Sequence, residues 1–459
     1  MDDTAPVNPR PDVRPARVSR RVSVALGVVL SMLAVEGIAR YRFAHPNPPP
    51  AGTGPAPRGM YVDDAAAGFR FAPGFQVPGL DFRTDEHGLR DSGRAWEPAT
   101  EGTLRVVVLG DSFAAGWGID DEGSFAALLD RTLTRAAGRE VEVWNLGVTH
   151  YGPEQSLERL RSAWSELRPD VVVLAFCLGN DAWDVVGGPG YFRISDSEMV
   201  SAGWAPRGSP LDDARAEMNR FEGAPDLPLD GWLQRHSYGW RMLLQLVSAA
   251  RGVERRTPFG LGRFDYEVFG GIPALAVEPE PDGVDEAWGL VDGVLAQLRG
   301  TAMSGGARLI VVPVPTRLQV HAGERGRAEA SLAELIAEGG LAPSSRLVPD
   351  RGGERLAAIC ERLDIELVDV ATPLRAAADS ERLYFRFDSH WTAGGHRVAA
   401  EALGPALVDG VDVEVLRAAL REEVAPGSYP TEAPPGRLSG SRAPARPEPA
   451  DPGSRGRMR

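Results

Sequence analysis

The alternation of two kinds of segment between residues 104 and 410 limits most strongly what this chain can fold into. Short, nearly continuous apolar runs such as "LRVVVLG" and "DVVVLAF" alternate with longer segments that carry apolar residues at helical spacing. The pattern predicts strands at 104–110, 141–147, 170–176, 307–315 and 365–370, and helices at 122–137, 153–167, 285–302, 353–363 and 393–403. Apolar strands that alternate with helices indicate an α/β fold, in which helices cover both faces of a parallel sheet.

Residues 59–423 are predicted to form one large domain around this sheet. The chain has 459 residues, of which 43% are hydrophobic, and this is enough for a substantial core. An insertion at 184–284 is rich in glycine, proline and aromatic residues. Because a structureless loop of that length is unusual, we expect a partly helical subdomain there. The Pro/Gly/Arg-rich tail at 424–459 is expected to be disordered.

The N-terminal region contains a candidate membrane segment, "VSVALGVVLSMLAVEGIA", at residues 22–39. At a helical rise of about 1.5 Å per residue, it is just long enough to cross a bilayer. The arginines of the polar tail at 1–21 favour a cytoplasmic N-terminus, and residues 40–58 have the composition of a flexible linker. We therefore expect an uncleaved signal anchor, with the domain in the periplasm or otherwise outside the cytoplasm. A cleaved signal peptide and a buried core helix remain open as alternatives.

Charge and cysteine content exclude some classes of function. The formal net charge of −14 argues against binding of nucleic acid through a basic surface. Cys177 and Cys360 both lie in apolar segments, so we expect two buried thiols, with a disulfide as the alternative. Neither cysteine belongs to a CxxC or His/Cys pairing that would suggest zinc.

Polar motifs follow the predicted strands at the point where an open parallel sheet binds its ligands. "GDS" at 110–112 follows the first strand, "NLGVTHYGPEQ" the second and "GND" at 179–181 the third. The last strand is followed by "FDSHWTAGGH", which begins at Phe387 and precedes the last helix. Each motif alone is weak evidence, since Ser, Asp and Asn also cap helices. Together, and in this order, they predict a site at one edge of the sheet.

The residues of these motifs suit acyl transfer through a serine. Such chemistry needs a base that takes the hydroxyl proton, a carboxylate that orients the base, and donors aimed at the developing oxyanion. Ser112 is the candidate nucleophile, His390 the base and Asp388 its orienting acid. The side-chain amide of Asn180 and backbone N–H groups at Ser112 and in the 147–150 turn are the candidate oxyanion donors.

With these motifs, residues 104–408 resemble the GDSL/SGNH hydrolases. The first block of that family is matched by 110–112, the third by 179–181, and the last by Asp388 and His390. The resemblance implies a flavodoxin-like three-layer α/β/α sandwich and acyl-ester chemistry that requires no metal or organic cofactor. The 184–284 insertion is the least matched part.

Two positions depart from the common pattern of the family. In many members the acid lies three residues before the histidine, where this chain has Phe387, whereas Asp388 lies two residues before His390. The Asp-x-His-Trp form resembles the branch that includes alginate and other exopolysaccharide O-acetylation proteins. In the second block, "GVTHYG" puts His150 where the family has glycine. His150 keeps a backbone N–H for the oxyanion, would adopt a glycine-like torsion at some cost, and also brings an imidazole near the site.

Other polar and aromatic residues of the motifs are expected to have structural roles. His396 should lie on the last helix as a structural residue rather than in a metal site with Asp388 and His390. Asp111 should hydrogen-bond within its turn, and Asp181 and Asp184 should cap the segment after their strand. Trp391 is expected to pack against its loop. The aromatic residues of the insertion are expected to be core residues, with a role in lining the acyl or acceptor site as the alternative.

The sequence therefore predicts a membrane-anchored serine esterase that acts on acyl esters, including acylated carbohydrate. A polysaccharide O-acyltransferase is the first alternative, and a non-catalytic glycan-binding or assembly protein the second. A nucleotide-binding protein is the least favoured, because no G-x-G-x-x-G follows the first strand.

Overall fold

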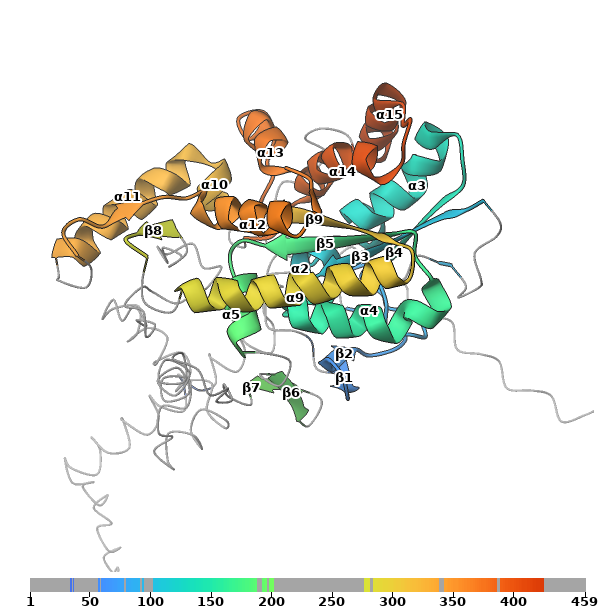
Figure 1. Ribbon diagram of the computed structural model, residues 1–459, viewed down its shortest axis with the longest axis horizontal. Helices are drawn as coiled ribbons and strands as arrows, with labels where there is room; N and C mark the ends of the chain where they lie inside the picture. Colours follow the sequence, from blue (N-terminus) through green and yellow to red (C-terminus); the bar gives the residue numbers. More distant parts are fainter. Residues whose placement is uncertain are drawn as a thin grey trace, which may run out of the picture. The chain divides into compact units, whose positions relative to one another are not determined.

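A computed structural model gives the architecture of the chain (Figure 1). It describes Ala34, Glu36 and Pro57 and the ranges 59–77, 80–90, 93–94, 102–187, 192–195, 198–201, 276–280, 284–337, 342–385 and 389–424. The predicted membrane segment at 22–39, the linker at 40–58, most of the 184–284 insertion and nearly all of the 424–459 tail lie outside these residues. Within them, no helix combines the length and apolarity needed to cross a membrane.

The central element is a five-stranded parallel sheet with the strand order β11-β9-β5-β3-β4. Its strands are β3 (Leu104–Gly110), β4 (Val141–Asn145), β5 (Val171–Cys177), β9 (Arg308–Val314) and β11 (Glu366–Leu367). Every residue of β5 is buried, as expected for a middle strand that is covered on both faces. The predicted parallel sheet is confirmed.

The edge strand β11 is shorter than the predicted 365–370. Ile365 is still held by the turn after the preceding helix, where its N–H bonds the carbonyl of Cys360 at 2.8 Å. At the other end, the Asp369 side chain accepts the N–H of Ala371, also at 2.8 Å, and starts the next helix. Local hydrogen bonds at both ends thus leave two residues for pairing with β9.

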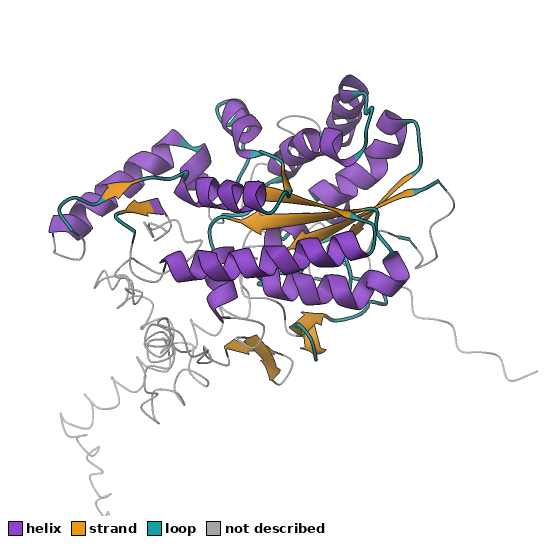
Figure 2. Cartoon of the chain, in the orientation of Figure 1, coloured by secondary structure: helices purple, strands orange, loops and turns teal. Residues whose placement is uncertain are grey.

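Helices cover both faces of the sheet and make a three-layer α/β/α arrangement (Figure 2). One core cluster joins the sheet to α4 (Pro153–Leu167), α5 (Asp181–Gly187), α9 (Val284–Ser304) and α12 (Arg351–Arg362). The other joins it to α2 (Ser112–Ala115), α3 (Phe125–Ala137), α13 (Ala371–Ala377), α14 (Ala393–Leu407) and α15 (Val413–Glu423). The α/β fold class is therefore as predicted.

Further helices and strands lie around this core. They are η1 (Asp121–Gly123), α10 (Arg317–Val320), α11 (Ala322–Ala337) and the strands β6 (Phe192–Ser195), β7 (Glu198–Ser201), β8 (Val277–Glu278) and β10 (Arg346–Leu347). An antiparallel hairpin of β1 (Tyr61–Asp64) and β2 (Gly68–Phe71) has its own apolar cluster, which also takes in Ala115, Val148 and Tyr151 of the main domain. The N-terminal hairpin is thus packed on the loops that follow β3 and β4.

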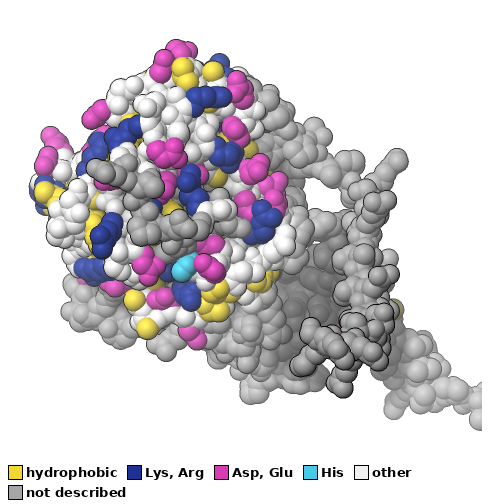
Figure 3. Space-filling view, turned by 90° about the vertical axis from the view of Figure 1, so that its right-hand side faces the viewer, with side chains coloured by type: hydrophobic (Ala, Val, Ile, Leu, Met, Phe, Trp, Pro, Cys, Tyr) yellow, Lys and Arg dark blue, Asp and Glu magenta, His cyan; other side chains and the backbone are white. Residues whose placement is uncertain are grey.

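The cysteines and the surface agree with the composition. Cys177 and Cys360 are both free and buried, which confirms the prediction of two thiols and excludes the disulfide alternative. On the face of the molecule seen in Figure 3, acidic and basic side chains are interspersed.

Candidate active site

Ser112 stands on a tight strand-to-helix turn after β3. Gly110 has a φ of 140°, and a Cβ at this position would lie 2.6 Å from the carbonyl oxygen of Ala175 on the adjacent strand. Asp111 follows and caps α2, because its Oδ1 accepts the N–H of Phe113 at 2.9 Å. Ser112 is the first residue of α2, and only 7% of its surface is exposed. The predicted role of Asp111 within the turn is confirmed.

His390 reaches Ser112 from the loop before α14. Its Nε2 lies 2.7 Å from Oγ of Ser112, so the imidazole is in place to take the hydroxyl proton. The ring packs on Phe113 with 5.1 Å between ring centroids, and the backbone carbonyl of His390 accepts the N–H of Phe385. Two motifs nearly 280 residues apart therefore meet. Asp388 lies outside the described residues, and its role as the orienting acid stays a prediction.

Two buried residues, Trp391 and His396, support the loop that carries His390. Trp391 is fully buried and packs edge-to-face on Phe113 and Phe125, with ring centroids 5.1 and 6.4 Å apart. His396 lies in α14, as predicted, and its Nδ1 accepts the N–H of Phe125 at 3.2 Å. Burial lowers the pKa of His396 to about 3, so the ring is neutral and can accept this bond. Among the described residues there is no cluster of side chains suited to holding a metal ion.

His150 occupies the turn after β4 with a φ of 66°, in the left-handed region. The expected glycine-like torsion is therefore present. The turn is closed by Tyr151, whose N–H bonds the carbonyl of Val148 at 3.1 Å. The His150 side chain is exposed, yet the protein atoms around the ring, and then the imidazole of His390, lower its pKa. The protein atoms lower the pKa by removing water from the ring, and the water that remains at its exposed side offsets part of this effect. Because the charge of His390 affects the pKa of His150, the turn at 150 lies near His390.

Asn180 follows β5, and its amide is held by a residue that sequence reasoning did not assign to the site. Its Nδ2 donates to Oδ2 of Asp184 at 2.6 Å, while its Oδ1 is buried without a hydrogen-bond partner. A primary amide has two N–H donors, and Asp184 takes one of them. Asn180 directly precedes α5 and Asp184 lies in its first turn, and this i, i+4 spacing is the only sequence signal for the contact.

The predicted capping roles of Asp181 and Asp184 are wrong. Oδ2 of Asp181 accepts the N–H of Cys177 at 2.9 Å, so this carboxyl bonds back to the end of β5 instead of to α5. Burial, and then repulsion from Asp111, raise the pKa of Asp181 well above its ordinary value and that of Asp184 to about 8. Burial also raises the pKa of Asp111, to about 6. At pH 7 these shifts keep Asp181 and Asp184 mainly protonated and leave Asp111 mainly ionised.

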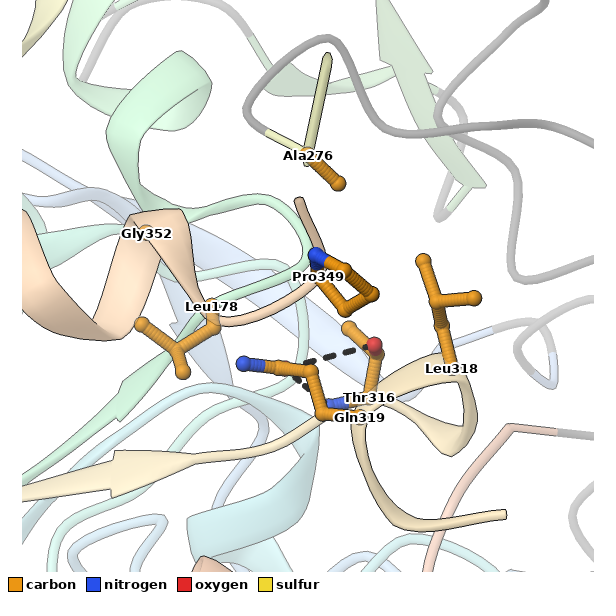
Figure 4. Close-up of a pocket in the computed structure, with 7 residues that line it drawn as sticks. All are labelled: Leu178, Ala276, Thr316, Leu318, Gln319, Pro349 and Gly352. Atoms are coloured by element: carbon orange, nitrogen blue, oxygen red, sulfur yellow. Dashed lines mark hydrogen bonds between the residues drawn. The ribbon is translucent and has the colours of Figure 1, made fainter. Parts of the chain in front are cut away.

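A small pocket lies where β5 and β9 end (Figure 4). Thr316, which follows β9, approaches Gly179 so closely that a Cβ on the glycine would lie 3.2 Å from Cγ2 of the threonine. The pocket thus borders the loop that carries Asn180. It is lined by Leu178, Ala276, Thr316, Leu318, Gln319, Pro349 and Gly352.

Comparison with known families supports the resemblance seen in the sequence. Residues 283–452 match the family model described as the SGNH hydrolase-like domain of the acetyltransferase AlgX. The match covers less than half of the chain, and it is this part that is similar to SGNH hydrolase-like domains. The matched range includes His390 and begins after the segments that carry Ser112 and Asn180, so those two blocks rest on the sequence motifs and the site geometry.

Other comparisons add little to this assignment. No curated protein matches the chain. Among solved structures, the chain is similar to LAE5, an α/β hydrolase from the metagenome of Lake Arreo, Spain (14% identity, 70% of this chain, 98% of that chain, TM-score 0.33). It is also similar to a catalytic mutant of Axe2, an acetylxylan esterase from Geobacillus stearothermophilus (10% identity, 68% and 95% of the chains, TM-score 0.33). A GDSL-like lipase from Bacteroides thetaiotaomicron gives 13% identity, 69% and 92% coverage and a TM-score of 0.29. At these TM-scores the likenesses carry no weight.

Proposed function

We propose that this protein is a serine-dependent esterase that cleaves acyl esters through an acyl-enzyme. The observation that carries the proposal is the 2.7 Å contact between Oγ of Ser112 and Nε2 of His390. Nucleophile and base at this distance are the signature of covalent acyl transfer. The burial of both residues in a turn built by β3 and the α14 loop supports the same role.

The proposed reaction has two steps. Oγ of Ser112 attacks the ester carbonyl carbon while Nε2 of His390 takes the hydroxyl proton. The amide of Asn180 and the backbone N–H of His150 stabilise the oxyanion, and His390 then gives its proton to the departing alcohol. In the second step His390 takes a proton from water while the water oxygen attacks the acyl carbon. The bond between Oγ of Ser112 and the acyl carbon then breaks, His390 returns the proton to Oγ, and the carboxylic acid leaves. Asp388 is proposed to orient the imidazole.

Transfer of the acyl group to a carbohydrate hydroxyl is the second candidate. The description of the matched family as an acetyltransferase domain favours it, as does the Asp-x-His-Trp sequence at 388–391. Chemically the two functions differ only in the second step, where a sugar hydroxyl replaces water. We further propose that residues 22–39 anchor the protein in a membrane and that the domain works outside the cytoplasm on acylated carbohydrate of the cell envelope.

The test uses the full-length protein in detergent with p-nitrophenyl acetate, beside its Ser112→Ala variant. Turnover that is lost in the variant is expected, with a drop of at least about a thousandfold in kcat. Adding an acceptor oligosaccharide separates the two candidates, because a transferase would yield acetylated oligosaccharide while free acetate declines. Equal activity of two folded proteins would refute the serine mechanism. Complete inactivity of both, also with acetylated glycan donors, would favour the glycan-binding alternative.

A further inference from the structure

We propose that Tyr61 and Tyr151 are positioning residues that hold the turn at His150 in its oxyanion-binding conformation. The inference rests on the proposed function. It assigns the N-terminal hairpin a role in that function, namely to position the turn at His150. The hairpin of β1 and β2 precedes both residues 104–408, where the sequence motifs resemble the family, and the matched range 283–452.

The two neighbours of His150 are both anchored to the hairpin. On one side, Oγ1 of Thr149 shares a short hydrogen bond with Oη of Tyr61. On the other, Oη of Tyr151 donates to the backbone carbonyl of Phe69 at 2.5 Å. The side chains of the two tyrosines and Thr149 are buried, with at most 4% of each residue exposed. A turn fixed at both flanking residues has little freedom to rotate the peptide between them.

Aromatic packing makes the anchor rigid. Phe69 packs edge-to-face on Tyr61 at 5.5 Å and on Tyr151 at 5.3 Å between ring centroids, so it lies between the two anchoring residues. Tyr61 also stacks on Phe71 at 5.6 Å. Burial raises the pKa of both tyrosine hydroxyls, which keeps them protonated and able to donate. Such aromatic pairs are favourable beyond the area that they bury.

The anchor matters because the backbone at His150 is strained. For a residue with a Cβ, the left-handed conformation is sterically unfavourable, so an unrestrained chain would leave it. The direction of the His150 N–H depends on that torsion. A donor that serves only the transition state affects kcat more than KM when it is displaced. Loss of the Tyr61 hydroxyl should therefore lower kcat about tenfold with little change in KM.

The test compares Tyr61→Phe with a matched control, Thr84→Val, in the full-length protein in detergent. Thr84 Oγ1 donates to the carbonyl of Ala72 at 2.6 Å and accepts the N–H of Phe75, so these two bonds stay within the N-terminal segment. Hydrogen–deuterium exchange of peptides covering residues 146–152 reports the turn, and p-nitrophenyl acetate kinetics report kcat and KM. We expect faster exchange and lower kcat in Tyr61→Phe, and neither change in Thr84→Val.

A double-mutant cycle with Thr149→Val shows whether Tyr61 acts through Thr149. The two single variants and the double variant should lose the same factor in kcat, because all three break one contact. Unchanged exchange at 146–152 in Tyr61→Phe would overturn the proposal whatever the activity. Faster exchange with wild-type kcat, in an enzyme whose turnover needs Ser112, would also overturn it. An absence of Ser112-dependent turnover would refute the proposed function alone, since the exchange measurement decides the positioning separately.

Discussion

Replacement of His396 by asparagine should make the protein less sensitive to acid. In the folded chain the His396 ring is fully buried and its Nδ1 accepts the N–H of Phe125, so burial lowers its pKa to about 3 from an ordinary value of 6.5. Between these two pH values the unfolded chain binds a proton at this site and the folded chain does not. The free energy of unfolding therefore falls as the pH drops below about 6.5, and the full contribution is present above it.

The change in unfolding free energy follows from the difference between the two pKa values. Each pH unit inside this window corresponds to about 1.36 kcal/mol, so acidification to pH 5 should remove about 2 kcal/mol through His396 alone. This is a large part of the stability of a typical domain, which is roughly 5–15 kcal/mol. Asparagine keeps an acceptor for the Phe125 N–H and does not titrate, so the variant should lack this loss.

The assay is urea unfolding of the wild type and His396→Asn at several pH values between 7 and 5. A control variant, His87→Asn, removes an imidazole that is only half-buried. The difference in unfolding free energy between the wild type and His396→Asn should change by about 2 kcal/mol over this range, while His87→Asn follows the wild type. Parallel curves for the wild type and His396→Asn would refute the inference that His396 is kept neutral by burial.

Four further substitutions, at three positions, test the surroundings of Ser112. His150→Gly should be more stable than His150→Ala by about 1 kcal/mol in thermal or urea unfolding, because only glycine adopts the φ of 66° without strain. Both variants should keep kcat within about twofold, since the backbone N–H remains; a large loss in both would assign the role to the imidazole. Asp184→Asn should gain stability over the wild type as the pH rises from 5 to 8, by at most about 1.4 kcal/mol per pH unit. Burial raises the pKa of Asp184 to about 8, so the unfolded chain loses this proton at a lower pH than the folded chain does. A difference in unfolding free energy between variant and wild type that stays constant from pH 5 to 8 would argue against a neutral Asp184. Gly147→Ala should destabilise by about 1–3 kcal/mol in urea, because a Cβ there would lie 2.6 Å from the backbone nitrogen of Ala115, and wild-type stability would contradict this close approach.

The sheet could be predicted from the sequence because each of its long strands is a short local run of apolar residues. The run of β5 is apolar over its full length, and those of β3 and β9 are apolar apart from Arg105 and Arg308. The helices between them carry clear 3.6-residue spacing. The end of β11 could not be predicted in this way, because the turn at Ile365 and the side chain of Asp369 compete with strand pairing. Neither competitor changes the hydrophobic pattern on which the prediction rests.

The pairing of Ser112 with His390 could also be predicted, since each lies in a motif at an edge where the topology brings loops together. The anchors of the site could not. Tyr61 and Thr149 lie 88 residues apart in segments of mixed composition, and nothing in either segment marks the other as its partner. For Asp184, an i, i+4 spacing from Asn180 was present but could not be told from ordinary helix composition.

The central claim is that Ser112 becomes acylated during turnover. The most direct measurement mixes the full-length protein with p-nitrophenyl acetate, quenches the reaction with acid within the first turnover, and analyses the peptide that contains Ser112 by mass spectrometry. The account predicts an acetyl group on Ser112 that appears with the first burst of p-nitrophenol and is absent in Ser112→Ala. Steady release of p-nitrophenol with an unmodified Ser112 peptide at every time point, and at the same rate in Ser112→Ala, would contradict it.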